Sequence, residues 1–256
     1  MERGDQAKAD SDVIDLHTHI LPGLDDGPQT LDESIAIVRQ LTAFGFDHFF
    51  LTPHFRQGFF ESSADAVRLA SKRLRAALGD DLPAVRFTEA HEVHLGSVLD
   101  SRGRIRDFLR FGPKEQYLLL ELPSQSFPFD LLSRVVERLF LEGIRIVLAH
   151  PEKNEDLREQ PSRYRELCER GVKLQVNVTS LAGFAGRRAR RAAEALCNEG
   201  MIHAMGTDSH SLAQVLKFVP RGLDRVRKLL GDERLRSVAD CAELSLDSSG
   251  EIRTWS

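Results

Sequence analysis

Two histidines one residue apart begin the chemically informative part of the chain. His17 and His19 lie in the stretch VIDLHTHILPGLDDGP, and the aspartates Asp25 and Asp26 follow within a few residues. Alternate side chains of a β-strand point to the same face, so both imidazoles could reach one ion. The same spacing also occurs on half-exposed strands. The stretch alone therefore leaves two interpretations open, a metal site and a polar surface strand.

The elements that must position these residues follow a regular alternation. Strand-like apolar runs occur near 12–18, 47–52, 84–93, 116–122, 144–149, 172–178 and 201–207. Helical patterns lie between or after them, over 30–44, 62–78, 129–142, 161–170, 186–199 and 219–238. This alternation predicts an α/β fold with a parallel sheet covered by helices, and seven strands favour a barrel related to the (β/α)₈ type.

The domain organisation predicted from the sequence is simple. No internal repeat or linker divides the chain. We expect a flexible N-terminal arm over 1–11, a single barrel domain over 12–240 and a C-terminal tail over 241–256.

Potential ligands recur where the expected strands end. Barrel enzymes build their sites at the carboxyl ends of the strands. Alone, Glu121 could be an ion-pair residue and His150 could cap a turn. Together, carboxylates buried at one rim without cations would be strongly unfavourable, and divalent metals remove that conflict. The candidate ligands are His17, His19, Asp26, His54, Glu92, Glu121, His150, Asp208 and His210.

The ligand types narrow the choice of metal. Imidazole and carboxylate donors without cysteine fit Zn²⁺, Mn²⁺ or Fe²⁺, and do not suit Ca²⁺ or a structural cysteine–zinc site. Nine ligands are too many for one ion and fit two or three ions that share a carboxylate. Glu92 is the candidate for that bridge.

Composition excludes several other classes of protein. The chain has 256 residues and a formal net charge of −4, so no global basic field attracts nucleic acid. The arginine cluster at 187–191 is interpreted as a solvated helix face in preference to an anion or partner contact. No apolar run approaches the ~20 residues of a membrane span. Three cysteines at long spacings and a polar N-terminus without a signal-peptide pattern predict a cytoplasmic protein.

The order of these motifs resembles the polymerase and histidinol phosphatase (PHP) superfamily. Within it, the segments DLHTHILPGLDDGP, TPHF, LQVNVTSLAGFAGRRA and GTDSH are similar to those of bacterial manganese-dependent protein-tyrosine phosphatases encoded with capsule and exopolysaccharide genes. The resemblance implies a distorted (β/α)₇ TIM-like barrel of the PHP type. It also implies two to three divalent ions, Mn²⁺ first and Fe²⁺ or Zn²⁺ as alternatives. All nine candidate ligands fall on the family's ligand positions.

The same resemblance implies the reaction and the substrate. Metal-activated hydroxide would attack the phosphorus of phosphotyrosine in the tail of a bacterial tyrosine kinase that regulates capsule or exopolysaccharide synthesis. Neither nucleic acid nor membrane insertion is expected, and the sequence leaves the oligomeric state open. The chain departs from the family in reading His150-Pro151-Glu152-Lys153 where an arginine is usual. Lys153 keeps the charge but cannot grip phosphate with a planar fork.

Residues beyond the ligands receive roles with open alternatives. Lys153, Arg56 and Asp26 are the predicted catalytic residues, although Arg56 is equally interpreted as a surface arginine. Asn177 and Phe55 are predicted substrate contacts, with backbone satisfaction and loop packing as the alternatives. Asp15, which shares the parity of His17 and His19, is a candidate to orient one of them, and Asp25 is expected to hold its loop or face solvent.

Two further functions compete with the phosphatase hypothesis. One is a small-molecule phosphatase of the same superfamily, for example on histidinol phosphate. The other is a non-catalytic regulator that binds a kinase tail. A related amidohydrolase is disfavoured because no lysine stands at a mid-barrel strand end to bridge two ions.

Overall fold

The computed structural model describes residues 13–82, 84–100 and 104–240 of the chain. The strands are β1 Ile14–Thr18, β2 His48–Leu51, β3 His54–Arg56, β4 Phe60–Glu61, β5 Arg86–Glu89, β6 Glu92–His94, β7 Tyr117–Glu121, β8 Arg145–Ala149, β9 Lys173–Asn177 and β10 Ala204–Gly206. The helices are α1 Leu31–Ala43, α2 Ala64–Leu78, α3 Leu95–Asp100, α4 Phe129–Leu141, α5 Glu155–Glu159, α6 Ser162–Glu169, α7 Val178–Leu181, α8 Gly186–Glu199 and α9 Leu212–Asp240. The predicted arm 1–11 and tail 241–256 lie outside the described residues, and the domain bounds stay a prediction.

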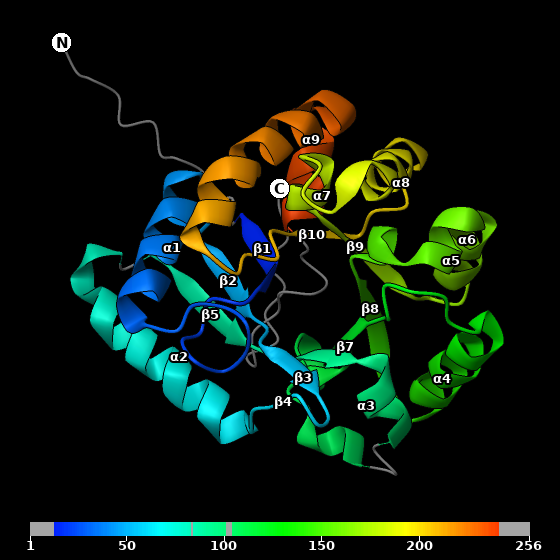
Figure 1. The fold of residues 1–256 in the computed structure, drawn as a ribbon, viewed down its shortest axis with the longest axis horizontal. Coiled ribbons are helices and arrows are strands. Elements are labelled where there is room, and N and C mark those ends of the chain that lie inside the picture. Colours follow the sequence, from blue (N-terminus) through cyan, green and yellow to red (C-terminus); the bar gives the residue numbers. More distant parts are fainter. Residues whose placement is uncertain (1–12, 83, 101–103, 241–256) are drawn as a thin grey trace.

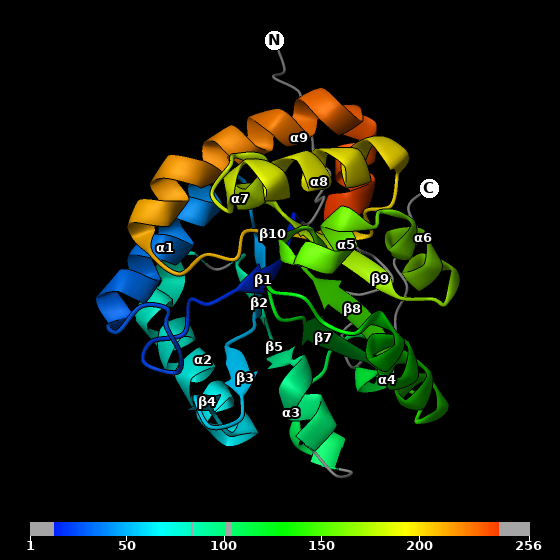
Figure 2. The ribbon, with the colours of Figure 1, turned by 45° about the vertical axis from the view of Figure 1, so that its right-hand side comes forward.

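The strands form an irregular ring with the helices outside it (Figures 1 and 2). One sheet runs β1-β2-β5 and the other β10-β9-β8-β7-β6-β3-β4. Parallel pairing joins β2 to β5 and β3 to β6, so β2/β3 and β5/β6 act as two neighbouring strands that are each interrupted. Hydrogen bonds from Asp208 N to His17 O (2.8 Å) and from His19 N to Ser209 O (3.1 Å) connect β10 to β1. In the described part of the chain, seven strand positions thus close the ring, as predicted for a distorted (β/α)₇ barrel.

The interruptions have local causes. Pro53 separates β2 from β3, and a proline has no N–H to continue the ladder. Its carbonyl nevertheless accepts from Glu92 N at 3.1 Å, which keeps the neighbouring strand in place. Between β5 and β6, His91 N turns away to Leu109 O at 3.1 Å. The strand expected over 84–93 is therefore two short strands, and the second begins at Glu92.

Apolar packing fixes the strands from both sides. Leu118, Leu120, Ile146 and Leu148 point outward into a buried cluster with the helices, while Leu119 and Val147, one position away, belong to a cluster shared by strands around the ring. This alternation is that of strands covered on both faces. The helix expected from 219 begins already at Leu212. Its first turns bury Val215 and Val219 against the cluster around α1 and α2, and that packing outweighs the helix-breaking tendency of Pro220.

A buried carboxylate fastens the last strand to the first. Thr207 donates to Asp15 from its backbone N (2.8 Å) and from Oγ1 (2.6 Å). Gly206 lies so close to β1 that a Cβ there would stand 2.5 Å from His17 Cβ, so only glycine permits this approach. The junction sets the position of His17 relative to the segment that carries Asp208. Among the described helices, none is both long enough and apolar enough to cross a membrane.

Replacing Thr207 by valine tests this junction. Thr207→Val leaves a buried Asp15 oxygen without its donor, so we expect the free energy of unfolding to fall by about 1–3 kcal/mol. Urea denaturation measures the change. Thr42→Val is the matched control, because the buried Thr42 hydroxyl has no hydrogen-bond partner among the described residues and its loss should cost little. Equal effects of the two substitutions would contradict the proposed fastening role.

Candidate metal centre

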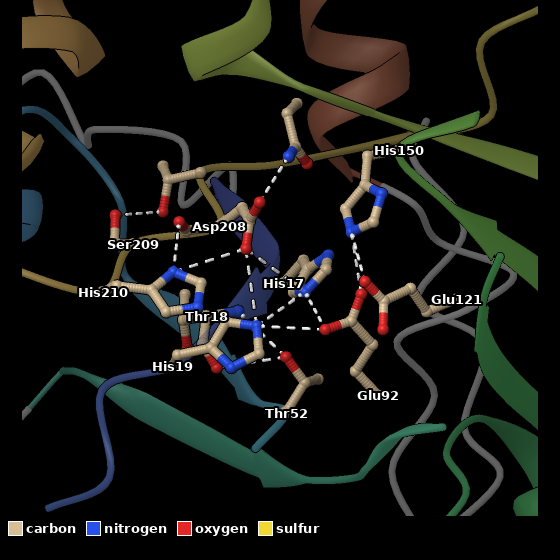
Figure 3. Close-up of polar contacts among 12 residues, drawn as sticks. His17, Thr18, His19, Thr52, Glu92, Glu121, His150, Asp208, Ser209 and His210 are labelled. Carbon is tan, nitrogen blue, oxygen red and sulfur yellow. Dashed lines mark hydrogen bonds and ion pairs between the residues drawn. The ribbon is translucent and has the colours of Figure 1, made fainter. Parts of the chain in front are cut away.

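The predicted ligands converge at the carboxyl ends of the strands. Figure 3 shows His17, His19, Glu92, Glu121, His150, Asp208 and His210 pointing toward one another. They form four overlapping groups in which the donor atoms of each group lie within 4.8 Å of one another. The groups are His19, Asp26, His54 and His210; His17, His19 and Asp208; His17, Glu92 and His150; and His54, Glu92 and Glu121. Residues from 17 to 210 thus meet in one place. Their assignment as metal ligands stays a prediction.

Glu92 lies at the centre of the cluster and is fully buried. Its Oε1 is 2.8 Å from His150 Nε2. Its Oε2 is 2.9 Å from His54 Nδ1 and 3.2 Å from the Nε2 atoms of His17 and His19. Although three imidazoles surround it, Oε2 makes no hydrogen bond with the described residues. A buried anionic oxygen with open lone pairs, ringed by ligand nitrogens, fits a bridging carboxylate between cations.

His17 on β1 and His19 just after it are oriented to bind a cation. His17 Nδ1 lies 2.9 Å from Gln175 Oε1, and His19 Nδ1 lies 2.7 Å from Asp25 Oδ2. These acceptors assign the proton to Nδ1 in each neutral ring, so both Nε2 atoms present lone pairs. The two Nε2 atoms are only 2.9 Å apart. Facing lone pairs repel unless a proton or a metal ion lies between them, so the donor set fits divalent ions.

Asp208 divides its carboxylate between two environments. Oδ1 faces His17 at 3.7 Å and His19 at 3.4 Å, whereas Oδ2 accepts from Lys153 Nζ at 2.5 Å and from Asn177 Nδ2 at 2.7 Å. The backbone of Asp208 is left-handed (φ 53°), as is that of His150 (φ 30°). Such non-glycine conformations are costly and cluster at functional sites. One oxygen is therefore free for an ion while the other is held in place.

The charges of the cluster are mutually dependent. Burial alone would lower the pKa of His17 and of His54, but Glu92 outweighs it and raises them to about 9 and about 10. Burial alone would raise the pKa of Glu92, but the charges of His17 and His54 hold it well below the usual value. Glu121 behaves oppositely, since burial and the charge of Glu92 raise its pKa to about 8. Without metal, protons must supply the positive charge that the carboxylates need.

Asp26 lies at the outer edge of the cluster. Its side chain is 56% exposed, and its Oδ1 is 3.2 Å from His210 Nε2 and 3.5 Å from His54 Nε2. The hydrogen bond from His210 is the main reason that the pKa of Asp26 falls to about 2. It remains an anion where the buried cluster opens to solvent.

The other predicted site residues differ in whether they reach the cluster. Lys153, in the turn η4 Pro151–Lys153, reaches the cluster through Asp208. Arg56 is exposed at the end of β3, two residues after His54. Asn177 is buried and bonds Asp208 and Gln175, an arrangement that favours a positioning role over a substrate contact. The structure does not bring Phe55 to the cluster, because its ring packs on Phe108 with centroids 4.8 Å apart.

Four supporting residues were assigned differently or missed from the sequence. Asp25 does hold its loop, because its carboxylate accepts a hydrogen bond from Gly27 N at 3.0 Å. It also accepts a hydrogen bond from His19 Nδ1 and is buried, so the alternative of solvent exposure was wrong. Asp15 bonds Thr207 and the backbone N of His17 and contacts no imidazole. Gln175 was missed, although it lies two residues before Asn177 and hence on the same strand face. Glu152 was also missed as a supporting residue, and it accepts from Asn177 N at 3.0 Å.

The fold and the cluster identify the protein as a β/α barrel with a candidate multi-metal centre at its rim. A probable 2-pyrone-4,6-dicarboxylic acid hydrolase from Acinetobacter baumannii superposes with a TM-score of 0.56 at 14% identity, covering 91% of this chain and 98% of its own. That likeness shows the fold alone.

The particular family follows from the whole chain. The chain belongs to the capsular polysaccharide synthesis CpsB/CapC family, whose model matches residues 13–241. It is 31% identical over 239 residues to the tyrosine-protein phosphatase YwqE of Bacillus subtilis, covering 91% of each chain. It is 23% identical to the tyrosine-protein phosphatase CpsB of Streptococcus pneumoniae, over 88% of this chain and 94% of that one.

A solved structure agrees with this assignment. It belongs to the crystal structures of YwqE from Bacillus subtilis and CpsB from Streptococcus pneumoniae, which are described as unique metal-dependent tyrosine phosphatases. It superposes with a TM-score of 0.78 at 29% identity, covering 89% of this chain and 91% of its own. The PHP-type barrel expected from the sequence motifs is thereby confirmed.

Proton release on metal binding tests the electrostatic argument. The pKa values of Glu121, His17 and His54 are raised to about 8, 9 and 10 in the metal-free protein. A pH of about 7 is below all three values, so these side chains carry protons. An ion that takes their lone pairs must displace these protons, so metal affinity should rise with pH. Calorimetric titration of chelator-treated protein with Mn²⁺, in two buffers of different ionisation enthalpy, measures the release. Binding without proton release would contradict the argument.

Proposed function

We propose that this protein is a metal-dependent protein-tyrosine phosphatase. The observation that carries the proposal is the convergence of nine imidazole and carboxylate side chains, with Glu92 at their centre, at the barrel rim. The names of the relatives in the CpsB/CapC family support the same activity. Metal dependence is supported by the description of the structure with a TM-score of 0.78.

The nine donors are proposed to hold two to three divalent ions. Glu92 would bridge, because its two oxygens face different histidines. His17 and His19 belong to two groups each and would contribute at the centre, while Asp26 and His210 would bind at the open edge. Mixed nitrogen and oxygen donors fit Mn²⁺, Fe²⁺ and Zn²⁺. Mn²⁺ is proposed first because of the resemblance to manganese-dependent phosphatases. Bound ions would lower the pKa of a water molecule and neutralise charge on the phosphoryl oxygens.

Lys153 is proposed to stabilise the transferred phosphoryl group. Its ammonium is held by Asp208, and burial, which alone would lower its pKa, is outweighed by Asp208, so the pKa is raised and the charge is kept. Its side chain is 25% exposed, so it is reachable from the mouth of the site. A fixed cation beside the reacting group needs no reorganisation during the reaction. Arg56 and Asp26, both at the exposed edge, are proposed to contact the substrate side of the centre.

The choice of an aryl phosphate has a chemical basis. The phenol of tyrosine has a pKa of about 10 and leaves more readily than an alkoxide. Less help from a general acid is then needed. The histidines of the cluster are all engaged with carboxylates or carbonyls, so none has to be assigned as a proton donor.

The proposed substrate is a phosphotyrosine-bearing protein. The relatives named CpsB and the family description link the chain to capsular polysaccharide synthesis. We propose a bacterial tyrosine kinase of such a system as the partner. The cytoplasmic location predicted from the sequence suits a kinase tail and stays a prediction.

A substrate panel tests the function. Chelator-treated protein, with and without restored Mn²⁺, is assayed on a phosphotyrosine peptide, the phosphoserine peptide of equal sequence and histidinol phosphate. We expect Mn²⁺-dependent turnover with phosphotyrosine preferred. Glu92→Gln should lose about 10³-fold in kcat, because it removes the shared anionic ligand. Glu137→Gln, exposed on α4, is the matched control.

Two outcomes of that panel would overturn the proposal. Preference for histidinol phosphate would indicate a small-molecule phosphatase. Metal binding without turnover of any substrate would indicate a regulator that binds a kinase tail.

Substitution of Lys153 separates charge from geometry. Lys153→Met should lower kcat by about 10²-fold with bound metal unchanged, because a transition-state cation is lost. Lys153→Arg keeps the charge and should retain activity within about tenfold. Steady-state kinetics together with metal analysis measure both, and Lys72→Met on the exposed face of α2 serves as the control. Unchanged kcat in Lys153→Met would exclude the assigned role.

A further inference from the structure

The β3–β4 hairpin borders the metal centre with one of its two faces. Arg56 pairs with Phe60, and Phe55 pairs with Glu61, in antiparallel register. Directly opposed residues share a face, and alternate residues of one strand do so too. His54, Arg56 and Phe60 therefore lie on the face of the metal centre, while Phe55 and Glu61 lie on the other.

Phe60 is in contact with a residue of the cluster. Its ring stacks on the imidazole of His54, with centroids 5.8 Å apart and planes inclined by 17°. Phe60 is partly exposed, so part of its ring remains accessible. The ring of Phe60 thus forms an apolar aromatic surface directly next to the candidate ligand His54.

Phe59, at the tip of the hairpin, extends this surface. Its side chain is 70% exposed, and among the large apolar residues that the structure describes only Leu141 is more exposed. The guanidinium of Arg56 stands 4.4 Å from the centroid of its ring. A cation on one face of an exposed ring is a stabilising arrangement that leaves the other face open for a partner.

The hairpin is held in shape before any substrate arrives. Its turn is closed by hydrogen bonds from Phe59 N to Arg56 O (2.9 Å) and from Gly58 N to Glu61 Oε1 (2.6 Å). Gln57 N also donates to Ser97 Oγ at 2.9 Å, which ties the tip to α3. A surface that is already ordered loses little entropy when it binds a ligand.

We infer that the site-facing side of this hairpin binds the aromatic ring of the substrate. The inference rests on the proposed function and adds the residues that select an aryl ester. In an aryl phosphate the ring is separated from phosphorus by a single oxygen. With a phosphoryl group bound on the His54 side of the centre, the ring would lie next to Phe60, which stacks on His54, and Phe59 stands beyond Arg56 at the hairpin tip. Offset or edge-on contacts between aromatic rings favour aryl over alkyl phosphates.

Binding of two phosphonates to the Mn²⁺-loaded protein tests this subsite. Phenylphosphonate carries the ring and methylphosphonate does not, and neither can be hydrolysed. Phe59→Ser and Phe60→Leu should each weaken phenylphosphonate binding by about two- to tenfold and leave methylphosphonate binding unchanged. Isothermal titration calorimetry measures both affinities. Leu141→Ser, at the far end of α4 and 84% exposed, is the control for removing a surface apolar side chain.

Kinetics provide the second readout. For p-nitrophenyl phosphate the two variants should raise KM with kcat nearly unchanged, whereas acetyl phosphate, a ringless substrate with a good leaving group, should be unaffected. Equal losses with both phosphonates, or no loss with phenylphosphonate, would overturn the inference. Failure of the proposed function is a separate result, seen as the absence of Mn²⁺-dependent turnover of phosphotyrosine peptide, and the phosphonate comparison decides on the ring subsite even then. Phe59→Ser changes only an exposed tip, so it remains a valid test if Phe60→Leu does not fold.

Discussion

The burial of the Glu92 carboxylate among imidazoles is the constraint on which the rest of the site depends. A buried anion is tolerated only when positive charge surrounds it. Four histidine nitrogens within 3.2 Å of its oxygens provide that charge when they are protonated. Divalent ions provide it better, because they also use the lone pairs that otherwise face one another across the His17–His19 contact. The same arrangement that makes the metal-free cluster costly gives it affinity for ions.

The barrel serves to bring these groups together with fixed orientations. His17 comes from β1 and His19 follows it directly, while Asp208 comes from the segment after β10. Asp15 and Thr207 join these two segments. Around the ligands, Gln175 and Asp25 fix the histidine tautomers. Asn177 and Lys153 occupy the outer oxygen of Asp208. His17, His19 and Asp208 thus each have a partner on the side away from the cluster. Such support is typical of metal ligands that must keep one orientation.

The two proposals assign reactivity and specificity to different edges of the candidate centre. Lys153 lies beside Asp208, where its cation is proposed to stabilise the phosphoryl group. The β3–β4 hairpin lies beside His54 and presents aromatic rings where the leaving group would lie. An active site that holds the phosphoryl group with charge and the leaving group with apolar contact discriminates by the difference between these two interactions.

Residue types and their periodicity were sufficient for the fold and for the candidate ligands. Strand-length apolar runs predicted seven strand positions, because an apolar strand buried on both faces has a distinctive composition. Donor residues at the strand ends predicted the cluster, because parallel strands end at one rim. The sequence could not assign Gln175 or Asp25 to their histidines, since those hydrogen bonds depend on rotamers and on contacts across 158 residues in one case and a turn in the other.

Only the tertiary structure decided which aromatic residue borders the site. Phe55, Phe59 and Phe60 are equivalent in the sequence, but the hairpin register turns Phe55 to Phe108 and Phe60 to His54. A strand's composition carries no information about which face is turned to which neighbour when both faces meet protein. The sequence by itself determined the donor set and the order of the elements, because these depend on residue type and spacing. The orientation of each side chain was decided by packing between distant segments, which no local pattern contains.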